Sequence, residues 1–184
     1  TDLKHLPSGL TSLNEFEYKK DDFHSKEFKN YLGKIKENFT NYYNFKYDKR
    51  VLSWVEQLST IDLDIKINQF TLTLCVNYKQ ADILYLMQYE MENLLNKIKG
   101  TKELTLEFQE YMNILGILNK NSFIKFLIDK KMLVKKKEDI SENMNVEIIE
   151  FNPKFKLKSK KKIDCSKLKL KNEENEKNNK EKPE

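Results

Sequence analysis

The residue types that could perform chemistry are few and lie far apart in the chain. The histidines are His5 and His24, and the cysteines are Cys75 and Cys165. Metal binding and nucleophilic catalysis need such residues in defined arrangements, for example Cys-x-x-Cys, His-x-x-x-His, paired carboxylates or a Ser/His/Asp set. No arrangement of this kind suggests a catalytic centre, and no glycine-rich phosphate loop is present. We therefore expect a non-catalytic protein with no metal and no cofactor.

The composition is typical of a helix-rich protein with a moderate core. The 184 residues include only four Gly and three Pro, with 39% hydrophobic and 34% charged residues, which argues against a sandwich or barrel. No apolar stretch approaches the roughly 20 residues that span a bilayer, and no secretory signal is present. Because two separated cysteines indicate no disulfide framework, we expect the cytoplasm and/or the nucleus. The chain begins with Thr1, so we expect a piece of a longer protein.

The positive charge is concentrated at the C-terminal end. Residues 154–184 hold 12 Lys and six Asp or Glu, a net charge of +6, which leaves −1 for residues 1–153. Because residues 1–153 are nearly neutral, the overall net charge of +5 is weak evidence for binding to nucleic acid. The Lys/Asn/Glu-rich end is predicted to be disordered, because it has too few apolar residues to form a core.

Two periodicities predict the first half of the fold. Apolar residues at three- and four-residue steps predict a helix that begins at an Asp22 cap. They are Phe28, Tyr31, Leu32, Ile35, Phe39 and Tyr42. Apolar residues at every second position then predict two strands joined by Asn68-Gln69, an antiparallel hairpin. They are Ile61, Leu63, Ile65 and Ile67, then Phe70, Leu72, Leu74 and Val76. Since an isolated hairpin is barely stable, it needs a further strand or a helix.

Helical spacing returns after the hairpin. Helices are predicted over residues 79–99 and 106–115, each ended by a glycine, and from Asn121 or Ser122. Short strands follow at Leu133–Val134 and Val146–Phe151, an order typical of a winged-helix module. The predicted class is α+β. Its parts are a lead-in (1–21), a bundle-end helix with a hairpin layer (22–77), a winged helix (78–157) and a disordered tail (158–184).

An ordered series of residues around the hairpin resembles the C-terminal region of the cullin family. The residues that carry the resemblance are Phe39, Tyr43, Arg50, Leu52 and Trp54 before the hairpin, Gln80 after it, and Phe151–Phe155 near the end. The similarity covers roughly residues 28–163. The cullin-like subunit of the anaphase-promoting complex is a further candidate relative.

The resemblance implies a scaffold for ubiquitin-dependent protein catabolism. In cullins the hairpin receives a strand from a RING-box subunit, so the eight alternating hairpin residues are the implied RING-subunit-binding site. The RING subunit in turn binds a ubiquitin-conjugating enzyme and brings it to the substrate. Cullins also carry a second winged helix with an acceptor lysine in an Ile-Val-Arg-x-Met-Lys context. No such motif occurs here, so no modification lysine is assigned.

Several interpretations stay open at this level. The cluster around Trp54 and Arg50 is interpreted as a packed junction, since large aromatic residues at such transitions are mostly buried. The hairpin could be completed by the lead-in, by the wing or by a partner strand. Other function classes are a winged-helix nucleic-acid binder and a winged-helix scaffold of the proteasome-lid type, with helical pairs before residue 78. The lysines that would contact nucleic acid are Lys125, Lys130, Lys131, Lys135, Lys136 and Lys137, a set that suits phosphate contacts better than base recognition.

Overall fold

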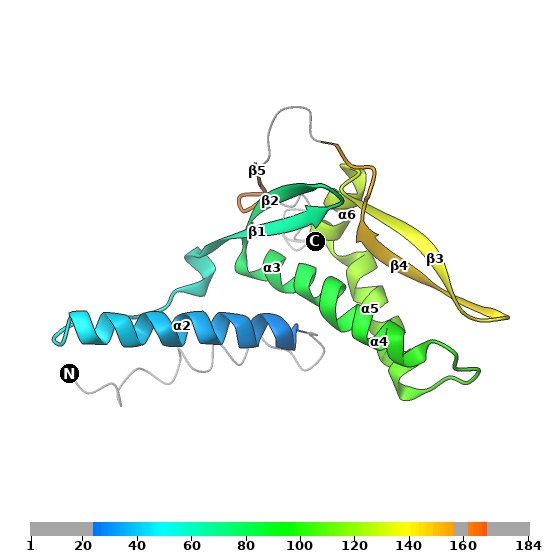
Figure 1. Cartoon of the computed structure of the whole chain (residues 1–184), viewed down its shortest axis with the longest axis horizontal. Helices are drawn as coiled ribbons and strands as arrows, with labels where there is room; N and C mark the ends of the chain where they lie inside the picture. The colour runs from blue at the N-terminus through cyan, green and yellow to red at the C-terminus, as the bar shows by residue number, and fades with distance from the viewer. Residues whose placement is uncertain (1–23, 157–161, 169–184) are drawn as a thin grey trace, which may run out of the picture.

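The protein, seen here as a computed structural model, has an α+β fold with two small sheets (Figure 1). The structure describes residues 24–156 and 162–168. The elements are α2 (Lys26–Lys46), η2 (Glu56–Leu58), β1 (Thr60–Ile67), β2 (Phe70–Asn77), α3 (Tyr78–Tyr85), η3 (Leu86–Glu90), α4 (Met91–Ile98), α5 (Leu106–Lys120), α6 (Ser122–Asp129), β3 (Leu133–Ser141), β4 (Met144–Phe151) and β5 (Lys162–Asp164). The predicted class is therefore confirmed. The lead-in and the tail beyond residue 168 lie outside the described residues, as does Asp22. The expectation that Asp22 caps the first helix is wrong, because α2 begins at Lys26 and its cap is Ser25. No described helix combines the length and apolarity needed to cross a membrane.

Strands β1 and β2 form the expected antiparallel hairpin, in which Ile67 pairs with Phe70 and Thr60 with Asn77. The turn residue Asn68 has φ 53°, a left-handed conformation that Asn adopts more readily than most residues. Alternation along both strands places the apolar residues on one face, toward the helices.

A third strand comes from a segment that was predicted to be disordered. Strand β5 lies parallel to β2 along Thr73–Cys75, and the Cys165 N–H then donates to the Cys75 carbonyl at 2.7 Å. The segment is held because Cys165 is completely buried and Ile163 is half-buried against the core. The chain therefore covers part of the outer edge of β2 itself, from the C-terminal side and not from the lead-in or the wing.

The helical stripe predicted over residues 79–99 is an uninterrupted helix made of α3, η3 and α4, with one π turn at η3. A capping box starts it. The Asn77 side chain accepts from the Gln80 N–H and the Gln80 side chain accepts from the Asn77 N–H, both at 2.9 Å. Gly100, at φ 82°, follows its end, as expected of a helix C-terminal glycine.

The helix predicted to end at Gly116 is longer. Helix α5 runs on to Lys120, because burial of Leu118 and its neighbours outweighs the roughly 1 kcal/mol that a glycine costs inside a helix. The Asn121 side chain then caps α6, as predicted, by accepting from two backbone N–H groups. Strands β3 and β4 are paired over Leu133–Ser141 and Met144–Phe151, which is longer than the short strands predicted at Leu133–Val134 and Val146–Phe151.

One core joins the hairpin, the helices and the second sheet. Its largest completely buried side chains come from α2, β2, η3, α4, α5, α6 and β3: Phe28, Leu72, Leu74, Val76, Leu86, Ile98, Tyr111, Ile114, Leu118, Ile124, Leu127 and Leu133. The Tyr111 hydroxyl donates to the Glu147 carbonyl at 2.7 Å, which ties α5 to β4. Its burial raises the pKa of Tyr111 to about 12.

Helix α2 is packed only at its beginning. After Phe28 and Leu32 it extends away from the body (Figure 1), and among the described residues only the returning segment around Trp54 lies along its later part and covers it incompletely. The prediction of a packed junction at Trp54 is therefore wrong: Phe39 is 45% exposed and Trp54 44%. These two rings contact each other instead, edge to face, with centroids 5.7 Å apart.

Candidate protein-interaction site

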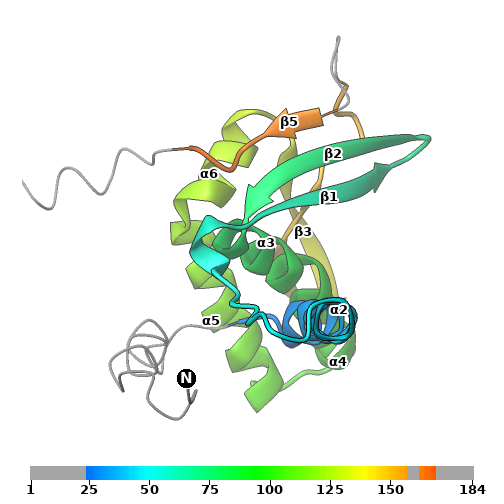
Figure 2. The same ribbon diagram turned by 90° about the vertical axis from the view of Figure 1, so that its left-hand side faces the viewer.

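The outer edge of β1 has no neighbouring strand among the described residues, because the sheet order is β1–β2–β5 (Figure 2). The two-residue turn makes Ile67 and Phe70 a hydrogen-bonded pair, and such pairs occur at every second position of an antiparallel ladder. The backbone N–H and C=O groups of Asp62, Asp64 and Lys66 therefore point away from β2. They are available to pair with an added strand.

The side chains on the inner face show the same asymmetry. Leu72, Leu74 and Val76 of β2 are completely buried. Their register partners on β1, Ile65, Leu63 and Ile61, are only half-buried although they lie on the same face. The apolar face of β1 is thus larger than the part that the described chain covers.

A groove lies beside this edge, with a volume of about 440 Å³. We call it the edge groove. Its lining residues are Leu63, Asp64, Ile65 and Lys66 of β1, Leu84, Tyr85, Gln88 and Tyr89 of the helix beneath, and Glu150 and Phe151 of β4. The helix thus extends past the last strand of the sheet, and α3 is seen below β1 in Figure 2. A strand added to β1 would lie over this uncovered part of the helix.

Two tyrosines form the apolar floor of the edge groove. The rings of Tyr85 and Tyr89 are stacked, with centroids 5.2 Å apart, and Tyr89 is 45% exposed. Partial burial raises the pKa of Tyr85, and the neighbouring Tyr89 adds to the rise. An apolar side chain that entered the groove would cover both rings and remove more of them from water.

The solvent face of the hairpin carries carboxylates. Asp62 accepts a hydrogen bond from the Lys162 ammonium at 2.8 Å, and that bond lowers the pKa of Asp62. Asp64 instead accepts from the neutral Thr73 hydroxyl at 2.6 Å. Among the described residues Asp64 makes no ion pair, and Lys66, two residues further on the same face of β1, makes none either.

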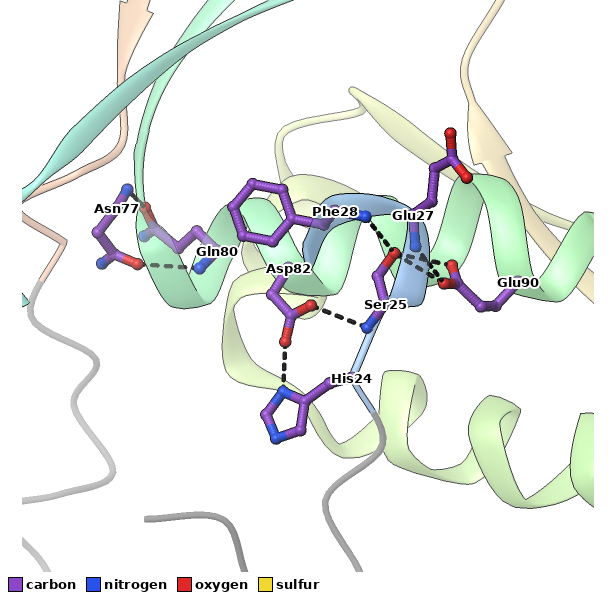
Figure 3. Close-up of polar contacts among 8 residues, drawn as sticks. All are labelled: His24, Ser25, Glu27, Phe28, Asn77, Gln80, Asp82 and Glu90. Carbon is purple, nitrogen blue, oxygen red and sulfur yellow. Dashed lines mark hydrogen bonds and ion pairs between the residues drawn. The ribbon is translucent and has the colours of Figure 1, made fainter. Parts of the chain in front are cut away.

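Helix α2 is fastened to the body near the groove by a polar cluster (Figure 3). Asp82 accepts from the Ser25 N–H at 2.9 Å, and its other oxygen lies 2.6 Å from His24 Nδ1. The Ser25 hydroxyl donates to Glu90 at 2.8 Å and also accepts from the Phe28 N–H at 3.1 Å, as the helix cap. Because Ser25 is completely buried and its hydroxyl is directed at Glu90, this cluster anchors a helix and does not form an activated nucleophile.

The predicted site residues fall into two groups. The eight hairpin residues share one face, as the alternation required, and Gln80 is buried at the start of α3, where its side chain donates to the Cys165 carbonyl at 2.8 Å. The residues of the family motif lie elsewhere. Phe39, Tyr43 and Trp54 gather along the projecting part of α2. Leu52 is half-buried in the segment that follows the helix, and Arg50 is exposed and stacks on Tyr47 at 4.8 Å.

Sequence reasoning missed the helix and β4 residues that line the edge groove. Tyr85 and Tyr89, four positions apart, would have indicated a second apolar stripe on the helix. The contribution of Glu150 and Phe151 depends on tertiary packing of the second sheet, for which the sequence gives no local signal.

The cysteines do not form a chemical site. Cys75 is half-buried and Cys165 completely buried, and neither takes part in a disulfide in the described chain. Burial raises the pKa of Cys165 to about 11, which keeps its thiol protonated. The described ranges contain no cluster of three or more His, Cys, Asp or Glu able to hold a metal ion.

The lysines considered for nucleic-acid binding are partly paired within the second sheet. Lys136 lies 2.8 Å from Glu150, and Lys135 lies 3.8 Å from Glu147, across the β3–β4 ladder. Lys99 similarly pairs with Glu138 at 3.1 Å. These carboxylates reduce the positive potential of the face that a phosphate backbone would approach.

No protein-family model matches the chain, and no curated protein is significantly similar to it.

Proposed function

We propose that this chain is a non-catalytic, cullin-like scaffold of a ubiquitin ligase, and that the outer edge of β1 receives a strand from a RING-box subunit. The observation that carries the proposal is the outer edge of β1, with which no strand of the described ranges pairs and whose apolar residues Ile61, Leu63 and Ile65 are half-buried. A partner strand would satisfy the outward backbone groups of Asp62, Asp64 and Lys66 and cover the exposed apolar surface.

The work of such a scaffold is positional. A RING subunit fixed by a strand in the sheet holds the ubiquitin-conjugating enzyme at a defined distance from a bound substrate. Holding two reactants together raises their effective concentration, and this accelerates transfer without a catalytic side chain on the scaffold. The proposed place of action is the cytoplasm or the nucleus.

Two further features support a cullin-like architecture. The order α5, α6, β3, β4 is that of the later part of a winged helix, and we include a winged-helix module in the proposal. The exposed apolar face of α2, which includes Phe39 and Tyr42, fits the end of a helical bundle whose other helices would cover it.

Co-expression with a panel of RING-box proteins tests the proposal. We expect at least one to co-purify with the chain, and Asp64→Pro to reduce its recovery about tenfold or more, because proline removes an outward N–H from the edge. Glu142→Pro, in the exposed turn between β3 and β4, is the control and should leave recovery unchanged. Urea denaturation of each variant shows that the hairpin is still folded.

The contrary results are equally specific. Indifference of the chain to every RING-box protein would count against the scaffold. Equal recovery with Asp64→Pro and with the parent chain would remove the β1 edge as the docking site.

The other function classes have less support. Residues 24–77 contain one long helix, a short 3-10 turn and a hairpin, not the stacked helical pairs of a proteasome-lid scaffold. The ion pairs of Lys135 and Lys136 weaken a nucleic-acid interface. Strong, salt-dependent binding of the chain to duplex DNA would favour that class instead.

A further inference from the structure

The edge groove does not end at β1. A second groove, of about 300 Å³, lies between α4 and the β3–β4 sheet, and we call it the distal groove. Gln88 and Glu150 line both grooves, so the two grooves lie next to each other at η3 and the end of β4. A segment that pairs with β1 and passes these two residues therefore reaches the distal groove.

The distal groove has an apolar floor and an acidic rim. Met87, Met91 and Ile148 contribute to the floor. Glu92 lies on the rim, is exposed, and makes no ion pair within the described chain. Methionines adapt readily to different apolar side chains, which suits a floor that binds a peptide.

The charges of both grooves favour a basic occupant. The linings hold four carboxylates, of Asp64, Glu92, Glu138 and Glu150, and two ammonium groups, of Lys66 and Lys99. Lys99 pairs with Glu138, and Lys136 from outside the grooves pairs with Glu150. Among the described residues this leaves Asp64 and Glu92 without a basic partner, one in each groove. Lys66 of the edge groove likewise has no acidic partner, so two unpaired carboxylates stand against one unpaired ammonium group.

We propose that the partner segment is an extended peptide with apolar residues at alternate positions and Lys or Arg between them, and that it continues from the β1 edge into the distal groove. The inference rests on the strand addition proposed above and specifies its chemistry. Alternate side chains of an added strand point toward the groove, over Tyr85 and Tyr89, while the others lie beside the solvent face, where Asp64 attracts a cation. A second cation downstream meets Glu92.

Labelled synthetic peptides and the full chain test this inference by fluorescence anisotropy. One short peptide, of about six residues, alternates Val with Lys, and a long one of about twelve residues extends the pattern, since an extended chain covers about 3.3 Å per residue. Two further peptides replace Lys with Glu or scramble the order. We expect the alternating basic peptides to bind about tenfold or more tightly than the acidic and scrambled ones, and the long peptide to bind more tightly than the short one.

Single charge reversals locate each contact. Asp64→Lys should weaken both basic peptides about three- to tenfold, whereas Glu92→Lys should weaken only the long one. Glu142→Lys, which makes the same charge change in the exposed β3–β4 turn, should weaken neither. Urea denaturation of each variant verifies that it is folded.

Three outcomes would overturn the inference: no binding of the basic peptides, equal binding of the scrambled peptide, or no effect of Asp64→Lys. Loss of the short peptide with Glu92→Lys would overturn the path into the distal groove. Dimers of the unliganded chain that Asp64→Pro dissolves would assign the edge to a second copy.

Failure here and failure of the scaffold proposal can be told apart. If no RING-box protein co-purifies but the chain still binds the alternating basic peptides more tightly than the acidic and scrambled ones, the proposed peptide chemistry is retained. The assignment of a RING-box protein as the partner is then wrong. If a RING-box protein co-purifies and its recovery is insensitive to Asp64→Lys, the scaffold stands and the charge assignment is wrong.

Discussion

Helix α2 has two halves that follow one sequence pattern but have different surroundings. Apolar residues recur at three- and four-residue steps from Phe28 to Tyr42. Phe28 is 1% exposed and its ring lies 5.1 Å from that of Tyr85, whereas Tyr42 is 56% exposed. Phe45, three residues further, is 90% exposed. The period therefore identifies the apolar face of a helix, but burial of that face depends on whether another element reaches it.

In the hairpin, too, burial of an apolar residue depends on whether a neighbouring element covers it. Leu74 and Leu63 are register partners on the same face, yet the first is completely buried and the second only partly. Among the described strands, β2 has neighbours on both sides, β5 and β1, while β1 has one. Both open regions, the later part of α2 and the edge of β1, are apolar surfaces that partner chains can cover.

Among the substitutions considered, Phe28→Ala should lower the free energy of unfolding the most. Phe→Ala in a packed core costs about 3–5 kcal/mol, and the anchor of α2 would lose its ring contacts with Tyr78 and Tyr85. Phe45→Ala, which removes the same side chain from an exposed position, should cost less than about 0.5 kcal/mol. Urea denaturation measures both. Equal effects would mean that both halves of α2 are covered.

Within the hairpin, we expect a smaller difference in stability between substitutions at Leu74 and at Leu63. Leu74→Ala should lower the free energy of unfolding by about 2–5 kcal/mol, because it leaves a cavity in the core. Leu63→Ala should cost about 1 kcal/mol or less in the isolated chain, since its side chain is only half-buried. With a strand-donating partner bound, the Leu63 effect should rise toward that of Leu74. An unchanged Leu63 effect in such a complex would contradict strand addition at β1.

The sequence allowed the local structure to be predicted well. Alternation over Ile61–Val76 predicted both strands and their turn, and Asn121 marked the start of α6, because these signals depend on neighbours in the chain. The fold class followed from the order of such elements. The prediction that the helix ends at Gly116 is wrong, because a helix tolerates one glycine where the residues around it are buried.

The features that could not be predicted are long-range. Strand β5 has only three residues within a lysine-rich segment, and nothing local shows that Ile163 and Cys165 lie against β2. The edge groove likewise combines β1, η3 and β4, whose proximity is a result of packing. Trp54 is exposed for the same reason, since its aromatic type indicates apolar character but not a covering element.

Thiol labelling tests whether β5 keeps the outer edge of β2 covered, in contrast to the open edge of β1. Cys165 follows β5, and its burial and its pKa of about 11 should slow its reaction with a thiol reagent about tenfold or more, relative to the denatured chain. The Cys75→Ser variant leaves Cys165 as the only thiol. Labelling as fast as in the denatured chain would mean that β5 dissociates readily, and that both outer strands of the hairpin offer an open edge.

The smallest expected effect concerns the ion pair that holds β5 from the solvent side. A hydrogen bond from Lys162 lowers the pKa of Asp62 below its usual 3.8, so the folded state binds that proton less tightly than the unfolded chain. The resulting stabilisation is present at neutral pH and is lost as the pH falls through the lowered value. Lys162→Met should therefore slightly lower the urea midpoint at neutral pH, and the two proteins should converge in acid, where Asp62 is protonated in both. Because the pair is exposed, the faster labelling of Cys165 in Lys162→Met is the more sensitive readout. An unchanged labelling rate would mean that backbone pairing and burial of Cys165 hold β5 in place. The ion pair between Asp62 and Lys162 would then make no measurable contribution to the attachment of β5.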